Sequence, residues 1–259
     1  MREALIIAHR GESYLAPENT LAAFELAWEL GDEAIELDVR PCGDGRVVVC
    51  HDENTLRITG QKFDHLIAET SFDELVKLDI GSWKGKEFAN QRFVLLENVL
   101  RQMPTGRIVF IEIKSEGDKC VEAVVEIMKQ SGRAAGEMRM ISFHERSIAA
   151  FRRMWAEGPE AFWLSGFSKD EKTGVWRPGV EEIIETARRC GANGVDVANC
   201  PMVDAAFVKR VHDAGLSCYV WTVDDPATAA QYIRDGVDGI TTNRAHWLSQ
   251  QLFSGACGE

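Results

Sequence analysis

Short apolar runs alternate along the chain with longer segments, most of which space their apolar residues as helices do. Eight such runs occur, at residues 4–9, 34–39, 107–113, 139–143, 161–166, 194–197, 218–223 and 239–242. Strands that alternate with helices pair in parallel, and eight units in about 250 residues predict a closed (β/α)8 TIM barrel. An open doubly wound sheet is the alternative, but no G-x-G-x-x-G motif follows the first run, which argues against its usual dinucleotide-binding form.

Two of the intervening segments carry clear helix signals. Residues 20–30 place Leu21, Phe24 and Trp28 on one face and end at a glycine, a common residue just after a helix. Residues 225–236 begin with aspartate as a candidate N-cap and proline at the first helical position, and they also end at a glycine. These boundaries support the alternation of strands and helices.

One gap between apolar runs is too short for a parallel crossover. Only residues 40–45 separate the second run from the sequence RVVVCHD, and they contain the hairpin signal Asp44-Gly45. We therefore expect an antiparallel hairpin with a two-residue turn. That register would place Asp38 opposite His51, with Glu36 two positions farther along.

The pattern from Asp52 to about Arg101 is irregular. Ser71 and Glu74 form a plausible capping box for a short helix within it. We expect a single domain over residues 1–259, with residues 53–101 as a subdomain inserted between the second and third barrel strands, where it could act as a lid.

Composition and charge narrow the function. The chain has 259 residues with 45% apolar content, enough for one large core, and a net charge of -12 that argues against nucleic acid or an anionic lipid surface as the partner. An anionic substrate would need a local basic pocket. Seven cysteines without a C-x-x-C pair predict reduced packing thiols, Cys50 among them. We expect no signal peptide and no membrane span, and hence a cytoplasmic enzyme or binding protein; the oligomeric state stays open.

Acidic residues near the ends of two predicted strands share one face. Glu36 and Asp38 are two positions apart, so both point away from the apolar residues that alternate with them and into the barrel. Glu112 occupies the corresponding place on the third barrel strand. A single acid of this kind could be a salt-bridged rim residue, but three converging acids repel one another unless a cation lies among them. Carboxylate oxygens favour Mg²⁺ or Ca²⁺ over zinc.

Two histidines and two cationic residues accompany these acids. His9 and His51 each end an apolar run, Arg10 follows the first histidine, and Lys114 lies two positions after the third acid. A lone histidine is more often structural, and we treat the other histidines of the chain in that way. The joint pattern instead indicates a metal site with a general acid and base and a clamp for phosphate.

These residues lie in blocks that resemble the glycerophosphodiester phosphodiesterase family. The blocks are HRGESYLAPENT, ELDVRPCGDGRVVVCHD, TLRITG, LDIGSW, IEIK and VWTVDD, in the family's order and spacing, and the resemblance spans residues 4–243. The first two blocks together are its specific part. The resemblance implies a (β/α)8 barrel with a small insertion after the second histidine.

The resemblance also implies roles for individual residues. It implies Glu36, Asp38 and Glu112 as ligands of one divalent cation, His9 and His51 as the acid/base pair, and Arg10 and Lys114 as phosphate contacts. Trp221 matches an aromatic residue that packs on the glycerol, although a core tryptophan would look the same. The implied reaction is hydrolysis of a small-molecule glycerophosphodiester to glycerol 3-phosphate and an alcohol. The segments RFVLLENVL and TTNRAHWL depart from the family pattern and leave the preferred head group open.

Several alternatives stay open at this point. The attacking group is water or the glycerol 2-hydroxyl, and the acid and base roles of the two histidines are not ordered. A related phospholipase-type phosphodiesterase that forms a cyclic phosphate is one other function, and an inactive barrel that binds a phosphodiester is another. Glu18 could approach the site or favour the start of the first helix, and Asn19 or Thr20 could cap that helix.

Overall fold

The computed structural model describes residues 4–253, and its eight parallel strands close into a barrel. Around the barrel they follow the order β1 (Leu5–Ala8), β2 (Ala34–Pro41), β4 (Ile108–Ile113), β5 (Met138–Ser142), β6 (Glu160–Ser165), β9 (Gly194–Ala198), β10 (Ser217–Trp221) and β11 (Gly239–Thr242). Strand β1 pairs with β11 on one side and with β2 on the other, which closes the barrel. The (β/α)8 TIM barrel is confirmed in place of an open sheet.

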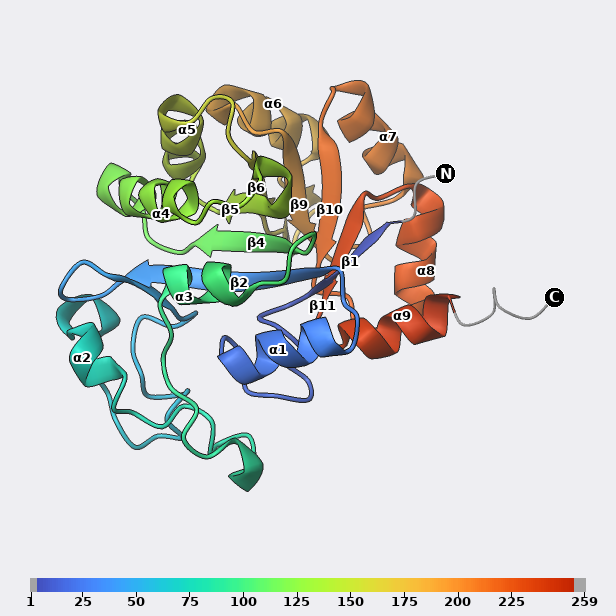
Figure 1. Ribbon diagram of the computed structural model, residues 1–259. Helices are drawn as coiled ribbons and strands as arrows, with labels where there is room; N and C mark the ends of the chain where they lie inside the picture. Colours follow the sequence, from blue (N-terminus) through green and yellow to red (C-terminus); the bar gives the residue numbers. More distant parts are fainter. Residues whose placement is uncertain (1–3, 254–259) are drawn as a thin grey trace.

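Helices cover the outside of this barrel (Figure 1). They are α1 (Leu21–Glu29), α3 (Leu96–Gln102), α4 (Asp118–Gln130), α5 (Glu145–Met154), α6 (Val180–Cys190), α7 (Ala205–Asp213), α8 (Pro226–Asp235) and α9 (Ala245–Phe253), with a short 3₁₀ turn, η3 (Ala135–Glu137), before β5. The first helix begins where the sequence predicts, because the Thr20 side chain accepts a hydrogen bond from the backbone N–H of Ala23. Asp225 caps α8 in the same way, and Gly236 ends it in a left-handed conformation.

Alternate residues of each strand face either the helices or the barrel interior. Ile35 and Leu37 of β2 belong to the core between strands and helices. Inside the barrel, Phe110, Phe162 and Tyr219 form an aromatic layer with ring centroids 4.9 to 6.1 Å apart. The layer fills the middle of the barrel, so the inward-facing residues two positions farther along these strands lie above it, at the C-terminal strand ends.

The predicted hairpin is present, but its predicted register is wrong by one residue. Strand β3 (Val47–Val49) pairs antiparallel with β2, and Val39 lies opposite Val49. The turn has three residues rather than two, because the backbone N–H of Cys42 bonds the carbonyl of Arg46 and Gly45 takes the left-handed φ of 84°. Asp38 therefore pairs with Cys50, whose N–H donates to the Asp38 carbonyl, and not with His51.

The chain after β3 builds a small second core beside the barrel (Figure 1). It contains η1 (Ile67–Glu69), α2 (Phe72–Leu75) and η2 (Lys86–Phe88). The predicted capping box starts α2, where the Glu74 carboxylate accepts hydrogen bonds from the backbone N–H and the hydroxyl of Ser71. Cys50 is buried in this second core, which agrees with a packing role. By contrast, the buried residues of α3 belong to the main core of the barrel.

A two-stranded hairpin of β7 (Ser168–Lys169) and β8 (Trp176–Arg177) follows β6 and has no counterpart in the sequence expectations. Six cysteines are buried and free; the seventh, Cys257, lies outside the described residues.

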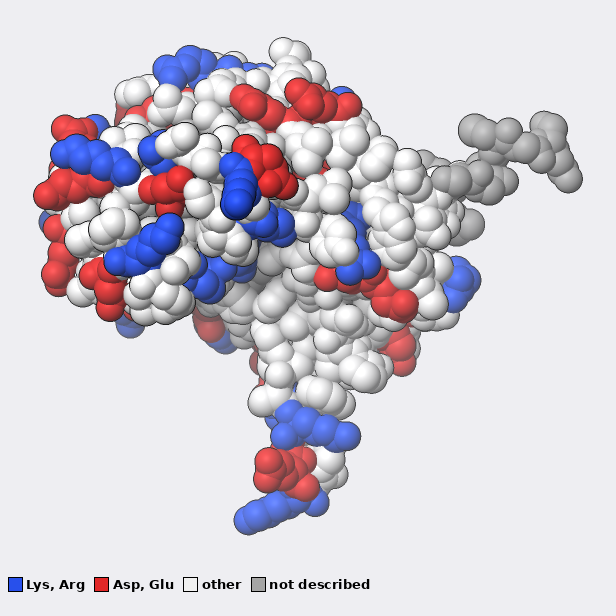
Figure 2. Space-filling model, turned by 90° about the horizontal axis from the view of Figure 1, so that it is seen from below, with Lys and Arg blue, Asp and Glu red and all other residues white. Residues whose placement is uncertain are grey.

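Charged side chains of both signs lie interspersed on the face seen in Figure 2, with uncharged surface between them. The Lys and Arg side chains on this face do not gather into one continuous basic patch. Among residues 4–253, no helix combines the length and the apolar character that crossing a membrane requires.

Candidate active site

A cavity of about 210 Å³ opens at the C-terminal ends of the barrel strands. This is the end at which TIM barrels carry their active sites. Its lining includes seven of the eight residues that the sequence singled out, and five more. The predicted ones are His9, Arg10, Glu36, His51, Glu112, Lys114 and Trp221, and the others are Ile141, Phe143, Leu164, Asp196 and Thr241.

The eighth predicted residue, Asp38, is fully buried behind the cavity wall. One carboxylate oxygen each from Glu36, Asp38 and Glu112 lies within 4.8 Å of the others. All three acids are buried, with exposed fractions of 3%, 0% and 8%. The alternation on β2 and β4 therefore brings the predicted acids together, as their inward positions require.

Burial and mutual repulsion perturb these acids strongly. Burial, together with the charge of Asp38, raises the pKa of Glu36 and raises the pKa of Glu112 to about 7. Burial acts in the same direction on Asp38, but Arg10 and Lys114 overcome it and lower the pKa of that carboxyl. Oε1 of Glu36 and Oδ1 of Asp38 are buried with no hydrogen-bond partner among the described residues. Buried carboxylate oxygens that lack a hydrogen bond, at this spacing, fit a hard divalent cation.

The two cationic residues lie directly against the acids. Arg10 Nε is 3.2 Å from Asp38 Oδ2, and Lys114 Nζ is 2.8 Å from Glu112 Oε1 and 3.5 Å from Asp38 Oδ1. The backbone N–H of Arg10 donates to Glu36 Oε2 at 3.0 Å, which the left-handed φ of 58° at Arg10 makes possible. Gly11 continues this turn, and a Cβ there would lie 2.7 Å from the backbone of Ala23.

His9 is held by an amide that is itself fixed. Its Nδ1 lies 2.8 Å from Oδ1 of Asn243. The backbone N–H and the side-chain Nδ2 of Asn243 each donate a hydrogen bond of 2.8 Å to the carboxylate of Asp224. Because these bonds fix the Asn243 amide, its oxygen faces the histidine and Nδ1 of His9 carries the hydrogen. Nε2 is left facing the acids, 3.9 Å from Glu36 Oε2. Burial, and then the charge of Arg10, lower the pKa of His9 and favour the neutral ring.

His51 is backed by a charged group instead. Its Nδ1 lies 2.7 Å from Oδ1 of Asp52, and the other oxygen of Asp52 accepts from Arg57 Nε at 2.6 Å. Burial lowers the pKa of His51 as well. Arg57 also donates two hydrogen bonds to Glu18, which accepts a third from Arg10. A chain of charged groups thus links His51 to Arg10, and it places Glu18 in contact with the Arg10 side chain of the site.

Sequence reasoning missed several residues that support the site. Asn19 does not cap the helix; its Nδ2 donates to Asp38 Oδ2 at 2.7 Å, and its Oδ1 accepts from the backbone N–H of Asp38. Asn243 and Asp224 were also missed, because their roles depend on contacts across the barrel. Asp196 had a usable signal, since it takes an inward position on its strand just as Glu36 does.

The wall opposite the acids is largely apolar. Trp221 at the end of β10 donates through Nε1 to the backbone carbonyl of Asp196 at 3.2 Å. Phe143 meets the Trp221 ring edge-on, with centroids 5.6 Å apart, and is 41% exposed. The Trp221 ring is therefore part of the cavity wall rather than of the core beneath the helices.

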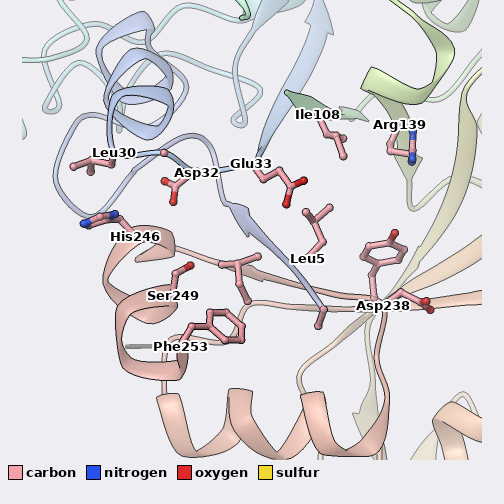
Figure 3. A pocket seen from close by; sticks show the side chains of 14 residues that line it. Leu5, Leu30, Asp32, Glu33, Ile108, Arg139, Asp238, His246, Ser249 and Phe253 are labelled. Carbon is pink, nitrogen blue, oxygen red and sulfur yellow. The ribbon is translucent and has the colours of Figure 1, made fainter. Parts of the chain in front are cut away.

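A larger cavity, of about 500 Å³, lies at the other end of the barrel (Figure 3). Asp32, Glu33 and His246 line it, with none of the predicted site residues. Burial and the neighbouring Glu12 raise the pKa of Asp32 to about 7. Residues at the N-terminal ends of barrel strands generally serve stability, so size does not make this cavity the active site.

Comparison with known proteins finds relatives of this chain in both sequence and fold. The sequence profile of the "Glycerophosphoryl diester phosphodiesterase family" matches residues 9–246. A glycerophosphodiester phosphodiesterase of Caldanaerobacter subterraneus is 33% identical over 259 residues, covering 98% of this chain and 99% of that protein. An Oleispira antarctica phosphodiesterase, solved with the product sn-glycerol-3-phosphate, superposes with a TM-score of 0.81 at 27% identity, covering 96% of this chain and 97% of that one.

A second solved structure, the glycerophosphodiester phosphodiesterase of Thermotoga maritima, has a TM-score of 0.73 at 26% identity and covers 96% of this chain and 99% of its own. Profile, sequence and fold thus agree over nearly the whole length. The chain belongs to the glycerophosphoryl diester phosphodiesterase family, a family of phosphoric diester hydrolases.

Proposed function

We propose that this enzyme hydrolyses glycerophosphodiesters to glycerol 3-phosphate and an alcohol, and that it uses one divalent cation, Mg²⁺ or Ca²⁺, held by Glu36, Asp38 and Glu112. The observation that carries the proposal is the trio of buried acids, two of which have an oxygen without a hydrogen-bond partner. Buried carboxylates left in this state are costly unless a cation joins them. A bound cation would act as a Lewis acid on the phosphoryl group.

The chain's own cations would bind the phosphate. Lys114 can donate three hydrogen bonds and Arg10 five, more than the carboxylates beside them accept. In this proposal their remaining N–H groups point to the non-bridging oxygens and orient the diester. They also offset the negative charge that develops there in the transition state.

His9 and His51 would transfer the protons. One removes the proton from the nucleophile, and the other donates a proton to the leaving alcohol. Each ring has its Nδ1 engaged, by Asn243 for His9 and by Asp52 for His51, so that Nε2 is the nitrogen available for transfer. Trp221 would pack against the glycerol part of the substrate.

Residues outside the cavity complete the proposal. We propose a single domain in which residues 53–101 form an inserted subdomain beside the site, with its last helix, α3, packed on the barrel core. Lys84 supports this, because its Nζ donates to the backbone carbonyl of Ser13 at 2.7 Å in the loop after His9. The six buried free thiols support a reducing, cytoplasmic location.

The test is an assay with glycerophosphocholine. The purified enzyme should release glycerol 3-phosphate in Mg²⁺ or Ca²⁺, and EDTA should abolish the release. His9→Ala and Glu36→Gln should each lower the rate about 10²- to 10⁴-fold. Glu33→Gln is the matched control, because Glu33 is exposed and lies near the opposite end of the barrel; its rate should equal that of the wild type.

Other outcomes of this assay would favour the alternatives. A cyclic phosphate as the product would indicate attack by the glycerol 2-hydroxyl and a phospholipase-type reaction. Binding of the diester without turnover would indicate an inactive barrel. Unchanged turnover in His9→Ala or Glu36→Gln would remove the proposed residue roles.

A further inference from the structure

A fourth buried acid lies in the cavity but outside the cluster of three. Asp196 is on β9, is 2% exposed, and belongs to the cavity lining. Its Oδ1 is buried with no hydrogen-bond partner within residues 4–253. The acids that could share a cation are Glu36, Asp38 and Glu112, and Asp196 is not one of them. The cation that explains those three acids therefore does not explain Asp196.

The strand that carries Asp196 is not a neighbour of the strands that carry the three acids. Strands β5 and β6 lie between β9 and β4, and β10, β11 and β1 lie between β9 and β2. In its own strand the carboxyl takes an inward position, beside Leu164 of β6 and Tyr219 of β10. It therefore faces the part of the cavity that Trp221 borders, across from Arg10 and Lys114.

The surroundings of this carboxyl are mostly apolar. Ile141, Phe143, Leu164 and Trp221 form the wall on this side. Burying a polar group in such a wall without a partner is unfavourable, so an apolar residue of similar size would stabilise the fold better. Burial, and then the charge of Glu112, raise the pKa of Asp196 to about 8, which leaves a carboxyl able both to donate and to accept a hydrogen bond.

A phosphodiester has two ester arms, and Asp196 lies on the side of the cavity where an arm packed against Trp221 would be. An arm made only of carbon would leave the carboxyl unpaired, whereas a hydroxyl-bearing arm would satisfy it. We propose that Asp196 hydrogen-bonds a hydroxyl of the ester arm that lies against Trp221, and thereby selects diesters with a small polyol on that arm. The inference rests on the proposed phosphodiesterase function and specifies how it chooses its substrate.

The test compares two substrates that differ only in the hydroxyls of one arm. They are the 4-nitrophenyl phosphodiesters of glycerol and of n-propanol, which share the same leaving group. The quantity measured is the ratio of kcat/KM for the glycerol ester to kcat/KM for the propyl ester. The variants are Asp196→Leu, which removes the polar group, Asp196→Asn, which keeps hydrogen bonding, and Asp64→Leu, which replaces an exposed carboxylate outside the cavity.

The wild type should prefer the glycerol ester. Asp196→Leu should lower the ratio about 10- to 100-fold, the effect of losing a strong hydrogen bond, whereas Asp196→Asn and Asp64→Leu should keep it within a few-fold. Asp196→Leu should also melt at or above the wild-type temperature, because a buried carboxyl that lacks a partner in the free protein does not stabilise the fold. An equal loss on both esters, or an unchanged ratio in Asp196→Leu, would overturn the inference.

Calorimetry separates this inference from the proposed function. Glycerol 3-phosphate and propyl phosphate are titrated into the wild type and into Asp196→Leu without any turnover. The inference predicts that Asp196→Leu weakens binding of glycerol 3-phosphate about 10- to 100-fold more than binding of propyl phosphate. Equal weakening of both contradicts it. A protein that hydrolyses neither ester but passes this binding test would lose the proposed function and keep the recognition by Asp196.

Discussion

Removing the amide that holds His9 should slow turnover with little effect on substrate binding. Asn243→Ala deletes the acceptor 2.8 Å from His9 Nδ1 and leaves the ring free to turn. In either proton-transfer role, His9 carries a positive charge at one point of the reaction, and Asn243 Oδ1 then accepts a charge-assisted hydrogen bond.

The magnitude follows from that single bond. A hydrogen bond to a charged group contributes about 1.5–3 kcal/mol, which corresponds to a decrease in kcat of about 10- to 150-fold. Asp224→Asn should give a smaller loss, because Asn243 keeps its contact with His9 but loses the carboxylate that accepts two hydrogen bonds from it.

The assay is steady-state release of glycerol 3-phosphate from glycerophosphocholine, with kcat and KM measured separately. Ser13→Ala is the matched control, since the Ser13 hydroxyl reaches the same Asn243 Oδ1 only at 3.4 Å and does not touch the histidine; its kcat should stay within threefold of the wild type. A folded Asn243→Ala enzyme with wild-type kcat would refute the reasoning.

Three further perturbations test the charges around the barrel. Burial and the neighbouring Glu12 raise the pKa of Asp32 to about 7, so the folded protein keeps a proton there that the unfolded chain releases above about pH 4. The free energy of unfolding should therefore fall as the pH rises from about 4 to 7. Asp32→Asn should reduce that fall, measured as the difference between the melting temperatures at pH 5 and pH 8. Asp79 accepts three backbone N–H groups and a hydroxyl in its loop, so Asp79→Ala should lower the free energy of unfolding by about 1–3 kcal/mol in urea titrations, and an unchanged midpoint would argue against that role. Arg57→Ala removes the partner shared by Glu18 and the carboxylate behind the second histidine, and should lower kcat while the melting temperature changes little; a wild-type kcat would count against the charged chain.

The sequence predicted those features that follow from strict local periodicity. Alternation along β2 put Glu36 and Asp38 on the inward face, and the same rule placed Glu112 and Lys114 at the end of β4. The same rule could have found Asp196, but no other polar residue at a neighbouring inward position of that strand marked it as part of a site. The alternation of side chains along a strand determines whether a residue faces the barrel interior or the helices. It does not determine which residues of other strands lie across the barrel from it.

Features that depend on turns or on distant contacts were beyond that rule. The hairpin register differs by one residue because Gly45 adopts a left-handed conformation in a three-residue turn, a choice that Asp-Gly alone does not determine. Asn19 looked like a helix cap, yet it takes a left-handed φ of 56° just before the N-cap Thr20, and its side chain contacts Asp38 instead. Asn243 is 234 residues from His9 in the chain, and only closure of the barrel brings them together.

The dependence of the hydrolysis rate on cation concentration tests the central claim most directly. Enzyme freed of metal by EDTA is assayed for glycerol 3-phosphate release while Mg²⁺ or Ca²⁺ is added back, for the wild type, Glu36→Gln and Glu33→Gln. The account predicts no release without a cation, saturable recovery in the wild type and in Glu33→Gln, and little or no recovery in Glu36→Gln. Full release in EDTA, or recovery in Glu36→Gln at the same cation concentrations as the wild type, would contradict it.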